Sequence, residues 1–157
     1  YSQRYYCGNH SPVYEERVRH GYFSLICQHH TKRNKHHWEY WVDFFAGRII
    51  ERTMPWSWAM EYICDTLSAS YCYNPKGFKQ DTPLRYFEKF NSFYYMTDWT
   101  REFIHWGLQR YAEMGFAGLK KKDTKKKYEE LGKPYPLTQV VEALRPFGQL
   151  PPLVSDI

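Results

Sequence analysis

Four helix-start signals divide this chain into helical segments. Each places a capping side chain or a proline ahead of an apolar run: Ser11-Pro12, Thr53-Met54-Pro55, Thr82-Pro83 and Thr97-Asp98. Ser, Thr and Asp side chains accept hydrogen bonds from the free N–H groups of a first helical turn, and proline fits that turn because it has no N–H to satisfy. The signals predict helices over about residues 12–45, 55–74, 83–96 and 98–114, the first kinked near Gly21 and stopped at Gly47.

The rest of the sequence adds only further helical segments. The stretch LKKKDTKKKYEEL, residues 119–131, either extends the fourth helix or forms a separate one, and PLTQVVEALRPF, residues 136–147, predicts a short last helix. The sequence shows no long alternating strand pattern, no internal repeat and no glycine-rich phosphate loop. It therefore predicts an all-α protein, a compact bundle of about five helices. We expect one domain over residues 1–146 and a proline-containing tail over 147–157.

Composition indicates a soluble protein. A chain of 157 residues is long enough to bury a core without disulfides or a structural metal. Its four cysteines form no CxxC pair, which favours reduced thiols in a cytosol-like compartment over a cysteine metal site. No apolar run reaches the roughly 18 residues of a membrane span and no leader is visible, so we expect a cytoplasmic protein without a membrane partner. Because the first residue is Tyr1 rather than Met, we expect further residues upstream.

The stretch HHTKRNKHHWEYW, which begins at His29, places four histidines in thirteen positions. On a helical wheel of about 100° per residue, His30 and His37 fall on the inward face with Asn34 beside them, while His29 and His36 flank that face and are half exposed. Two inward imidazoles with an amide between them suit a metal or phosphate site between helices, because neutral imidazole is a good ligand. The alternative, hydrogen-bonded core histidines within a solvated basic face, stays open.

The predicted second helix carries two carboxylates among apolar residues. Its apolar side chains form two stripes, so we expect the helix to be buried nearly all round. Glu61 and Asp65 lie between the stripes, and buried carboxylates need a cation, because desolvating an unpaired charge costs several kcal/mol. The sequence leaves open whether that cation is Arg33, a protonated histidine or a divalent metal. Carboxylates and imidazoles from two helices make a ligand set for Mn, Fe, Zn or Mg, with a bound water for hydrolysis.

The same two stretches resemble a known family. HHTKRNKHHWEYW followed by MPWSWAMEYICD resembles an uncharacterised bacterial and phage family, a domain of unknown function, whose members carry N-x-HHWEYW and then MP, a few residues and E-M-x-CD-W. The matching positions are Asn34, His36, His37, Trp38, Glu39, Tyr40 and Trp41, then Met54, Pro55, Glu61, Cys64 and Asp65. Two positions differ, because Tyr62 and Thr66 stand where the family has Met and Trp.

This resemblance implies a fold and a function. The family's helices look similar to those of HD-type phosphohydrolases, in which histidines and aspartates from several helices hold one or two metals. For this chain the resemblance implies His37 or His36 and Asp65 as ligands, with Glu61 as a ligand or as the partner of one. Family members also carry an upstream histidine and an HD-x-SKF segment, which would precede the first residue of this sequence.

The residues and the resemblance together predict a divalent-metal-dependent phosphohydrolase-like domain that acts on a nucleotide or another phosphomonoester. The predicted metal ligands are His30, His36, His37 and Asp65. The predicted catalytic residues are Glu61 and Arg33, and the predicted phosphate-binding residues are Lys32, Asn34 and Lys35.

Two non-catalytic hypotheses compete with this one. The stretch KKKDTKKK suits non-specific contacts with nucleic-acid phosphates. A solvated helix end explains the same stretch as well. Its lysines are Lys120, Lys121, Lys122, Lys125, Lys126 and Lys127. The 15 Tyr and 6 Trp residues and the proline-containing tail instead suit a structural subunit of a larger assembly, such as a phage virion.

Overall fold

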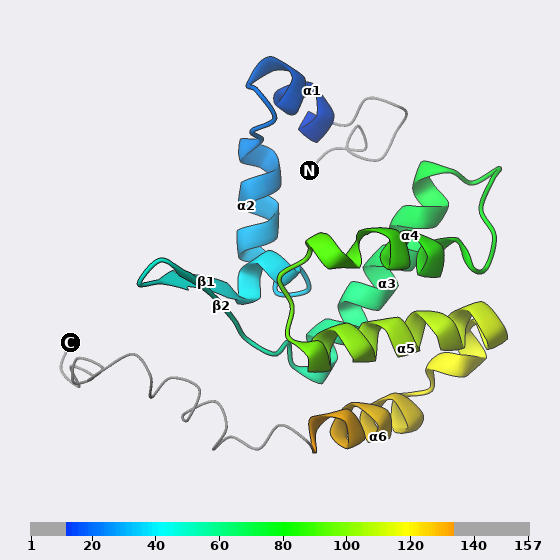
Figure 1. The fold of residues 1–157 in the computed structure, drawn as a ribbon. Coiled ribbons are helices and arrows are strands. Elements are labelled where there is room, and N and C mark those ends of the chain that lie inside the picture. The colour runs from blue at the N-terminus through cyan, green and yellow to red at the C-terminus, as the bar shows by residue number, and fades with distance from the viewer. Residues whose placement is uncertain (1–11, 134–157) are drawn as a thin grey trace.

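The computed structural model describes residues 12–133, and the predominantly helical class predicted from the sequence is confirmed (Figure 1). The described chain forms six α-helices: α1 (Pro12–Arg19), α2 (Leu25–Arg33), α3 (Trp56–Tyr73), α4 (Thr82–Phe90), α5 (Asp98–Met114) and α6 (Lys121–Gly132). Short 3-10 helices lie between them at Trp38–Trp41, Asn91–Phe93 and Gly115–Leu119. A two-stranded antiparallel sheet, β1 (Val42–Phe45) and β2 (Arg48–Glu51), precedes α3.

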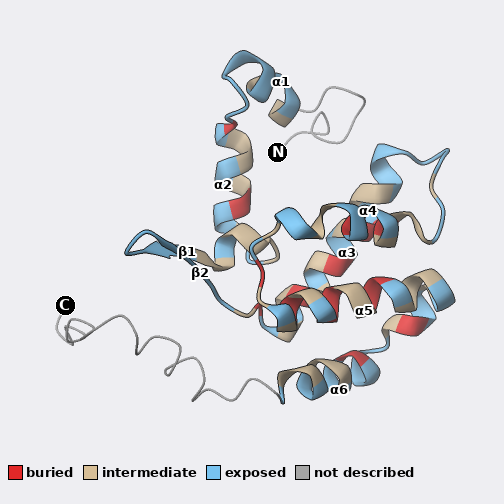
Figure 2. Ribbon diagram, in the orientation of Figure 1, coloured by how far each residue is buried: buried red, intermediate tan, exposed pale blue. Residues whose placement is uncertain are grey.

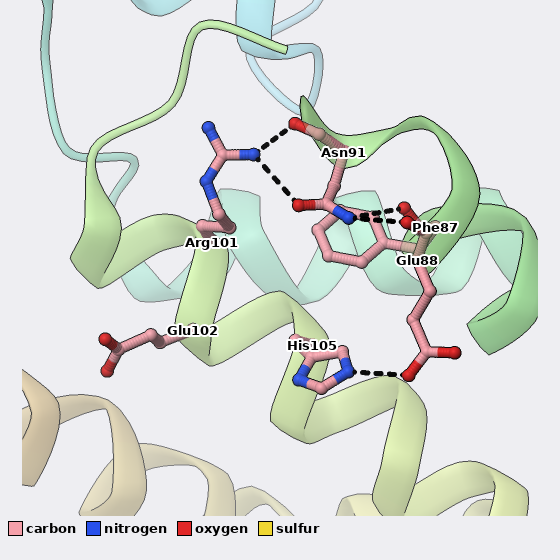
Figure 3. A pocket seen from close by; sticks show the side chains of 6 residues that line it. All are labelled: Phe87, Glu88, Asn91, Arg101, Glu102 and His105. Carbon is pink, nitrogen blue, oxygen red and sulfur yellow. Dashed lines mark hydrogen bonds and ion pairs between the residues drawn. The ribbon is translucent and has the colours of Figure 1, made fainter. Parts of the chain in front are cut away.

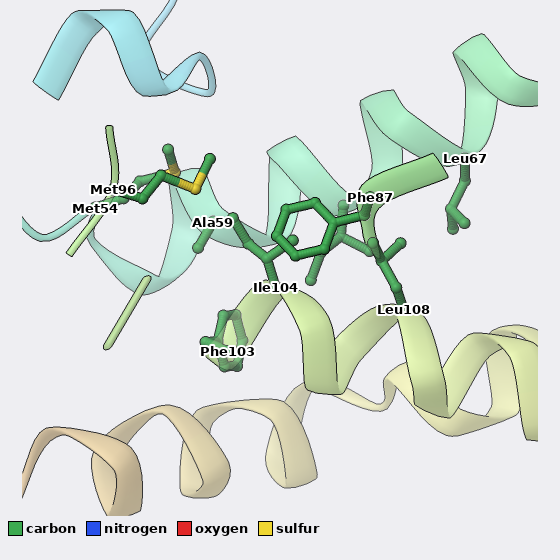
Figure 4. Close-up of a cluster of buried hydrophobic side chains, with 9 residues drawn as sticks. Met54, Ala59, Leu67, Phe87, Met96, Phe103, Ile104 and Leu108 are labelled. Atoms are coloured by element: carbon green, nitrogen blue, oxygen red, sulfur yellow. The ribbon is translucent and has the colours of Figure 1, made fainter. Parts of the chain in front are cut away.

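Helices α3, α4 and α5 close around one hydrophobic core (Figure 4). Its buried side chains come from these helices and from the residues just before α3 and α5: Met54, Ala59, Ile63, Leu67, Phe87, Met96, Phe103, Ile104 and Leu108. Burying one large apolar side chain stabilises a fold by about 1.5–3 kcal/mol, so this cluster holds the domain together. Helix α6 also packs against α5, whereas no residue of α1 is buried (Figure 2).

The predicted starts of the later helices are confirmed. Thr97 precedes α5, and its hydroxyl accepts a hydrogen bond from the backbone N–H of Thr100. The Thr100 hydroxyl in turn accepts from the backbone N–H of Met54, with a nitrogen–oxygen distance of 3.0 Å. Since Pro55 directly precedes α3, the two helix starts that the sequence marks are tied to each other.

The predicted first helix, residues 12–45, is wrong in its extent. Gly21 and Tyr22 have φ angles of +63° and +71°, in the left-handed region that a right-handed helix does not enter. A new helix, α2, then begins after Ser24, whose hydroxyl accepts from the backbone N–H of Cys27. The expected kink near Gly21 is therefore a complete break between α1 and α2.

A β-hairpin replaces the end of that predicted helix, which corrects the all-α prediction. Ala46 and Gly47 have φ angles of +49° and +73°, and positive φ at both central residues is the requirement of a type I′ hairpin turn. Phe45 and Arg48 pair across it. The β-branched and aromatic residues of both strands favour extended backbone. Gly47 thus closes a hairpin rather than stopping a helix, and the hairpin projects away from the helices (Figure 1).

The lysine-rich segment forms a separate helix, α6, rather than an extension of α5. Gly115, at a φ of +62°, ends α5 and begins the 3-10 helix that leads to α6. The predicted last helix over 136–147 and the tail over 147–157 lie outside the described residues. Within residues 12–133, no helix has both the length and the apolar character that crossing a membrane requires.

Candidate metal site and adjoining cavity

Three histidines converge between the end of α2 and the 3-10 helix that follows it. The ring centroids of His36 and His37 are 4.4 Å apart, those of His30 and His37 are 4.6 Å apart, and those of His30 and His36 are 6.0 Å apart. One nitrogen from each ring lies within 4.8 Å of the other two. Among residues 12–133, this is the one group of at least three His, Cys, Asp or Glu side chains with metal-site spacing. We call it the histidine triad.

Asn34 is the reason that the triad forms. It ends α2 in extended conformation, and its Nδ2 donates to the backbone carbonyl of His30 at 2.7 Å. The same amide nitrogen lies 3.1 Å from Nδ1 of His30. The chain then turns back, and the backbone N–H of His37 donates to the carbonyl of Asn34. The backbone N–H and the side chain of Asn34 both bond the His30 carbonyl near the end of α2, and the turn that follows brings His36 and His37 back towards His30.

The helical wheel, which placed His30 and His37 on one face and two turns apart, is wrong, although the two rings do lie side by side. The helix ends at Arg33, so the chain reversal and not a shared helical face brings the two rings together. His36, expected to be half exposed, has a side chain only 12% exposed and belongs to the triad.

His36 is bonded on one side and unsatisfied on the other. Its Nδ1 lies 3.0 Å from Oε1 of Glu61, on α3. Its Nε2 is buried and has no hydrogen-bond partner among residues 12–133. A proton on Nδ1, donated to the carboxylate, leaves the Nε2 lone pair available, and this carboxylate–imidazole pairing is the usual support of a metal-binding histidine.

His37 is held in its neutral form. Burial lowers the pKa of His37 to about 3, and the neighbouring His36 and His30 act in the same direction. Burial, followed by the charge of His36, also lowers the pKa of His30, which Asp65 partly opposes. Nε2 of His37 is buried without a hydrogen-bond partner among the described residues. Neutral imidazoles with unused lone pairs are what a metal ion requires.

The donor set of the triad suits a transition metal. Three imidazole nitrogens fit Zn, Fe, Cu or Ni, whereas Mg prefers oxygen ligands in a nearly octahedral arrangement. Three protein ligands also leave a coordination position for water. Of the metals that the sequence suggested, Zn and Fe fit these residues better than Mg.

The two carboxylates are not buried as the sequence predicted. Glu61 and Asp65 are exposed, because α3 buries one face only, through Ala59, Ile63 and Leu67. At about 100° per residue, each carboxylate lies about 200° around the helix from the buried residue two positions before it. Glu61 contacts His36, while Asp65 lies outside the triad.

The predicted phosphate-binding residues and the predicted catalytic Arg33, at the end of α2 and just after it, contact other parts of the chain or solvent. Lys32 Nζ donates to the backbone carbonyl of Glu39 at 2.9 Å, and Lys35 Nζ lies 5.7 Å from the ring centroid of Trp58. Arg33 is exposed at the last position of α2. Together with Asn34, which bonds His30, these residues lie outside the cavity described next.

A cavity of about 610 Å³ adjoins the triad, and His37 belongs to both. Its charged lining residues are Arg17, Glu39 and Asp65. Aromatic side chains line it as well: Trp38, Tyr62, Tyr73, Tyr86 and Tyr94. Sequence reasoning placed Asp65 and His37 in the site but missed Arg17, Glu39 and the tyrosines, although a carboxylate inside the aromatic block WEYW was a visible signal.

A second, smaller pocket between α4 and α5, about 250 Å³ in volume, is structural in character (Figure 3). Arg101 donates to the backbone carbonyls of Asn91, Tyr94 and Met96. These bonds tie the segment that carries Tyr94, a residue of the larger cavity, to α5. On the same pocket, Nε2 of His105 lies 2.9 Å from Oε1 of Glu88.

The lysines of the α6 region lie mainly at the surface. Lys120, Lys121, Lys122, Lys125 and Lys126 are exposed, and Lys127 is half-buried. Lys125 Nζ lies 5.0 Å from the ring centroid of Trp56, and Lys126 lies 3.9 Å from the Glu130 carboxylate. None of these six lysines belongs to the triad or to the lining of the cavity.

Comparison with known proteins gives one match. The model of a family of unknown function, DUF5662, matches residues 1–110, a range that includes the triad, Glu61 and the whole lining of the cavity but not α6. No curated protein and no solved structure matches the chain. Since the match covers more than half of the sequence, the chain belongs to the DUF5662 family, whose function is unknown.

Proposed function

We propose that this protein binds one divalent transition-metal ion at His30, His36 and His37 and hydrolyses a small substrate held in the adjoining cavity. The observation that carries the proposal is the pair of buried Nε2 atoms, on His36 and His37, without hydrogen-bond partners among residues 12–133. Leaving such groups unsatisfied costs about 1–3 kcal/mol each, and a metal ion at the triad would remove that cost.

The chain's own residues have distinct roles in this proposal. Bound metal would supply a Lewis acid and a water of lowered pKa. Glu61 orients His36 through the 3.0 Å contact to Nδ1. Asp65 and His37 both line the cavity, so Asp65 is the carboxylate available to accept a proton from a water beside His37. Arg17, also on the cavity lining, is the cation available to an anionic leaving group.

Phosphoesters are the substrates to test first. The resemblance to HD-type phosphohydrolases suggests a phosphomonoester or a nucleotide, and a metal with a guanidinium suits a phosphoryl group. A carboxylic ester or an amide is the contrasting class. Phosphomonoester hydrolysis that requires both added metal and His36 would support the phosphohydrolase hypothesis. Hydrolysis of carboxylic esters alone would indicate an esterase instead.

Elemental analysis of the purified full chain tests the metal site directly. We expect about one transition-metal ion per chain, and a loss of metal in His36→Ala and His37→Ala. His105→Ala is the matched control, because His105 also contacts a glutamate, Glu88, at 2.9 Å but lies outside the triad. Metal-free wild-type protein that takes up neither Zn²⁺ nor Fe²⁺ would refute the proposal.

The lysines of the α6 region support a second candidate, non-specific binding of nucleic acid. Five of the six are exposed, and lysine contacts to phosphates release counterions. Binding to duplex DNA should therefore weaken steeply with salt and with Glu at positions Lys121, Lys122 and Lys126. Unchanged binding in that triple variant would refute this candidate. Membership of a larger assembly, suggested by the Tyr and Trp content, stays a prediction.

A further inference from the structure

The cavity beside the triad has a negatively charged interior. Its charged lining consists of two carboxylates, Glu39 and Asp65, and one guanidinium, Arg17. A wall with an excess of carboxylates attracts positive charge and repels a purely anionic ligand. The charge of the cavity therefore favours a ligand with a cationic part.

Glu39 marks where that cationic part binds. Its Oε2 is buried and has no hydrogen-bond partner among residues 12–133. The nearest lysine contact goes to the backbone, since Lys32 Nζ donates to the carbonyl oxygen of Glu39 and not to its carboxylate. The same carboxylate lines the cavity, so a ligand there can reach it. A buried carboxylate of this kind is stabilised when a cation arrives.

Aromatic side chains line the same cavity as this carboxylate. Trp38 and Tyr94 stack with centroids 5.8 Å apart and planes inclined by 25°, and both line the cavity with Tyr62 and Tyr86. Burial raises the pKa of Tyr62 above its usual value, and Tyr94, Glu39 and Tyr86 act in the same direction. Tyr62 and Tyr94 therefore lie near enough to Glu39 to interact with its charge. Aromatic faces around a carboxylate are the arrangement that recognises ammonium groups.

We propose that the cavity binds the ammonium group of an organic cation, with Glu39 as its counter-ion and Trp38, Tyr62, Tyr86 and Tyr94 as its aromatic walls. This inference deepens the proposed function. It rests on that function in one respect, because it takes the ligand of the cavity to be the substrate and assigns the cavity to the substrate's amine-bearing end. An ester or phosphoester of an amino alcohol has the required form: its ammonium group lies against Glu39 and its ester bond is directed towards His37.

Calorimetric titration of the metal-free full chain with choline tests this inference apart from the metal site. The key comparison uses the neutral carbon isostere of choline, in which a tert-butyl group replaces trimethylammonium. Both molecules have the same shape, so hydrophobic filling of the cavity would bind them equally. We expect saturable choline binding and an affinity for the isostere that is about tenfold or more weaker.

Two variants locate the ammonium group. Glu39→Gln keeps the shape of the side chain and removes its charge, so we expect choline affinity to fall about tenfold or more. Glu88→Gln is the matched control, because Glu88 is an exposed carboxylate on the smaller pocket between α4 and α5, and we expect it to leave choline binding unchanged. The isostere comparison needs no variant, so it decides the question even where Glu39→Gln unfolds.

Three results would overturn the inference: no saturable choline binding, equal affinities for choline and its isostere, or binding of inorganic phosphate in place of choline. The last result would assign the cavity to an anion. Metal content is measured separately on His36→Ala, so failure of choline binding with metal retained by the wild type refutes the ammonium inference alone. Choline binding to a protein that takes up no metal refutes the hydrolase proposal alone.

Discussion

Nδ1 of His36 lies 3.0 Å from Oε1 of Glu61, and Nε2 of the same ring is buried with no hydrogen-bond partner in the described part of the chain. The carboxylate comes from α3 and the imidazole from the loop after α2, so packing of these two segments fixes the ring's tautomer. Because a carboxylate on one nitrogen raises the basicity of the other, Glu61 would support His36 as a ligand of the proposed metal without being a ligand itself.

Removal of the Glu61 charge should weaken metal binding and spare the fold. For Glu61→Gln we expect metal affinity to fall about 10- to 100-fold, the usual effect of losing a carboxylate behind a histidine ligand. Glu61 is exposed, so the melting temperature of the metal-free protein should change little. Competition titrations with Zn²⁺ measure the affinity, and Glu88→Gln serves as control. Equal Zn²⁺ affinity in Glu61→Gln and wild type would mean that this contact does not support a ligand.

Asn34 should matter for the site as well as for stability. Its Nδ2 donates to the His30 carbonyl at 2.7 Å and lies 3.1 Å from Nδ1 of His30. Asn34→Ala should lower the free energy of unfolding by about 0.5–1.5 kcal/mol and also weaken metal binding, because the turn that returns His36 and His37 loosens. Chemical denaturation and Zn²⁺ titration measure the two effects.

Asn91 offers a matched control for that substitution. Its Nδ2 donates to the carbonyls of Phe87 and Glu88 near the end of α4, at 3.0 and 2.9 Å. Asn91→Ala should destabilise the fold by a similar amount while Zn²⁺ affinity stays at the wild-type value. Equal losses of affinity in the Asn34 and Asn91 variants would show that Asn34 acts on stability alone.

Gly118 should tolerate no side chain. A Cβ at this buried position would lie 2.5 Å from the backbone carbonyl oxygen of Arg110 on α5, so the 3-10 helix before α6 would have to move. We expect Gly118→Ala to destabilise the protein by about 1–3 kcal/mol, as overpacking usually does. Denaturant unfolding measures the change, with Ala117→Ser at the exposed neighbouring position as control. An unchanged midpoint in Gly118→Ala would contradict the close approach of these segments.

The junction of α1 and α2 should depend on pH. Oε2 of Glu16 accepts from the Ser24 hydroxyl at 2.7 Å and from the backbone N–H of Ile26 at 3.0 Å, and these bonds, the backbone one first, lower the pKa of Glu16 below 4.5. A lowered carboxyl pKa gives stabilisation that is present above the unfolded-state pKa of 4.5 and is lost as pH falls through the folded-state value.

Hydrogen exchange of the Ile26 amide checks this prediction. After correction for intrinsic exchange rates, protection should fall between about pH 5 and pH 3 in the wild type. Glu16→Gln should lack that pH dependence, and Glu15→Gln, at an exposed neighbouring position, should retain it. A wild-type protection factor that stays constant over this range would refute the role of Glu16.

Local signals determined much of the helical framework. The starts of α3, α4 and α5 follow from Pro55, Thr82-Pro83 and Thr97, because capping and proline effects act within one helical turn. One apolar stripe predicted on α3 comprised Trp56, Ala59, Met60, Ile63 and Leu67. Ala59, Ile63 and Leu67 are buried, and the other two are half-buried. The break at Gly21 and the hairpin turn at Gly47 were misread, since glycine alone does not distinguish a kink, a helix stop and a type I′ turn.

The sequence by itself determined which residues were candidates for a metal site, His30 and His37 among them. Only the tertiary structure decided that His36 joins them, that Glu61 contacts His36 from another helix, and that Glu39 carries a buried carboxylate oxygen beside an aromatic cavity. The physical reason is range. Caps and turns depend on neighbours within a few residues, whereas the burial and pairing of a polar group depend on segments that meet only in the folded chain, such as α3 and the loop that carries His36.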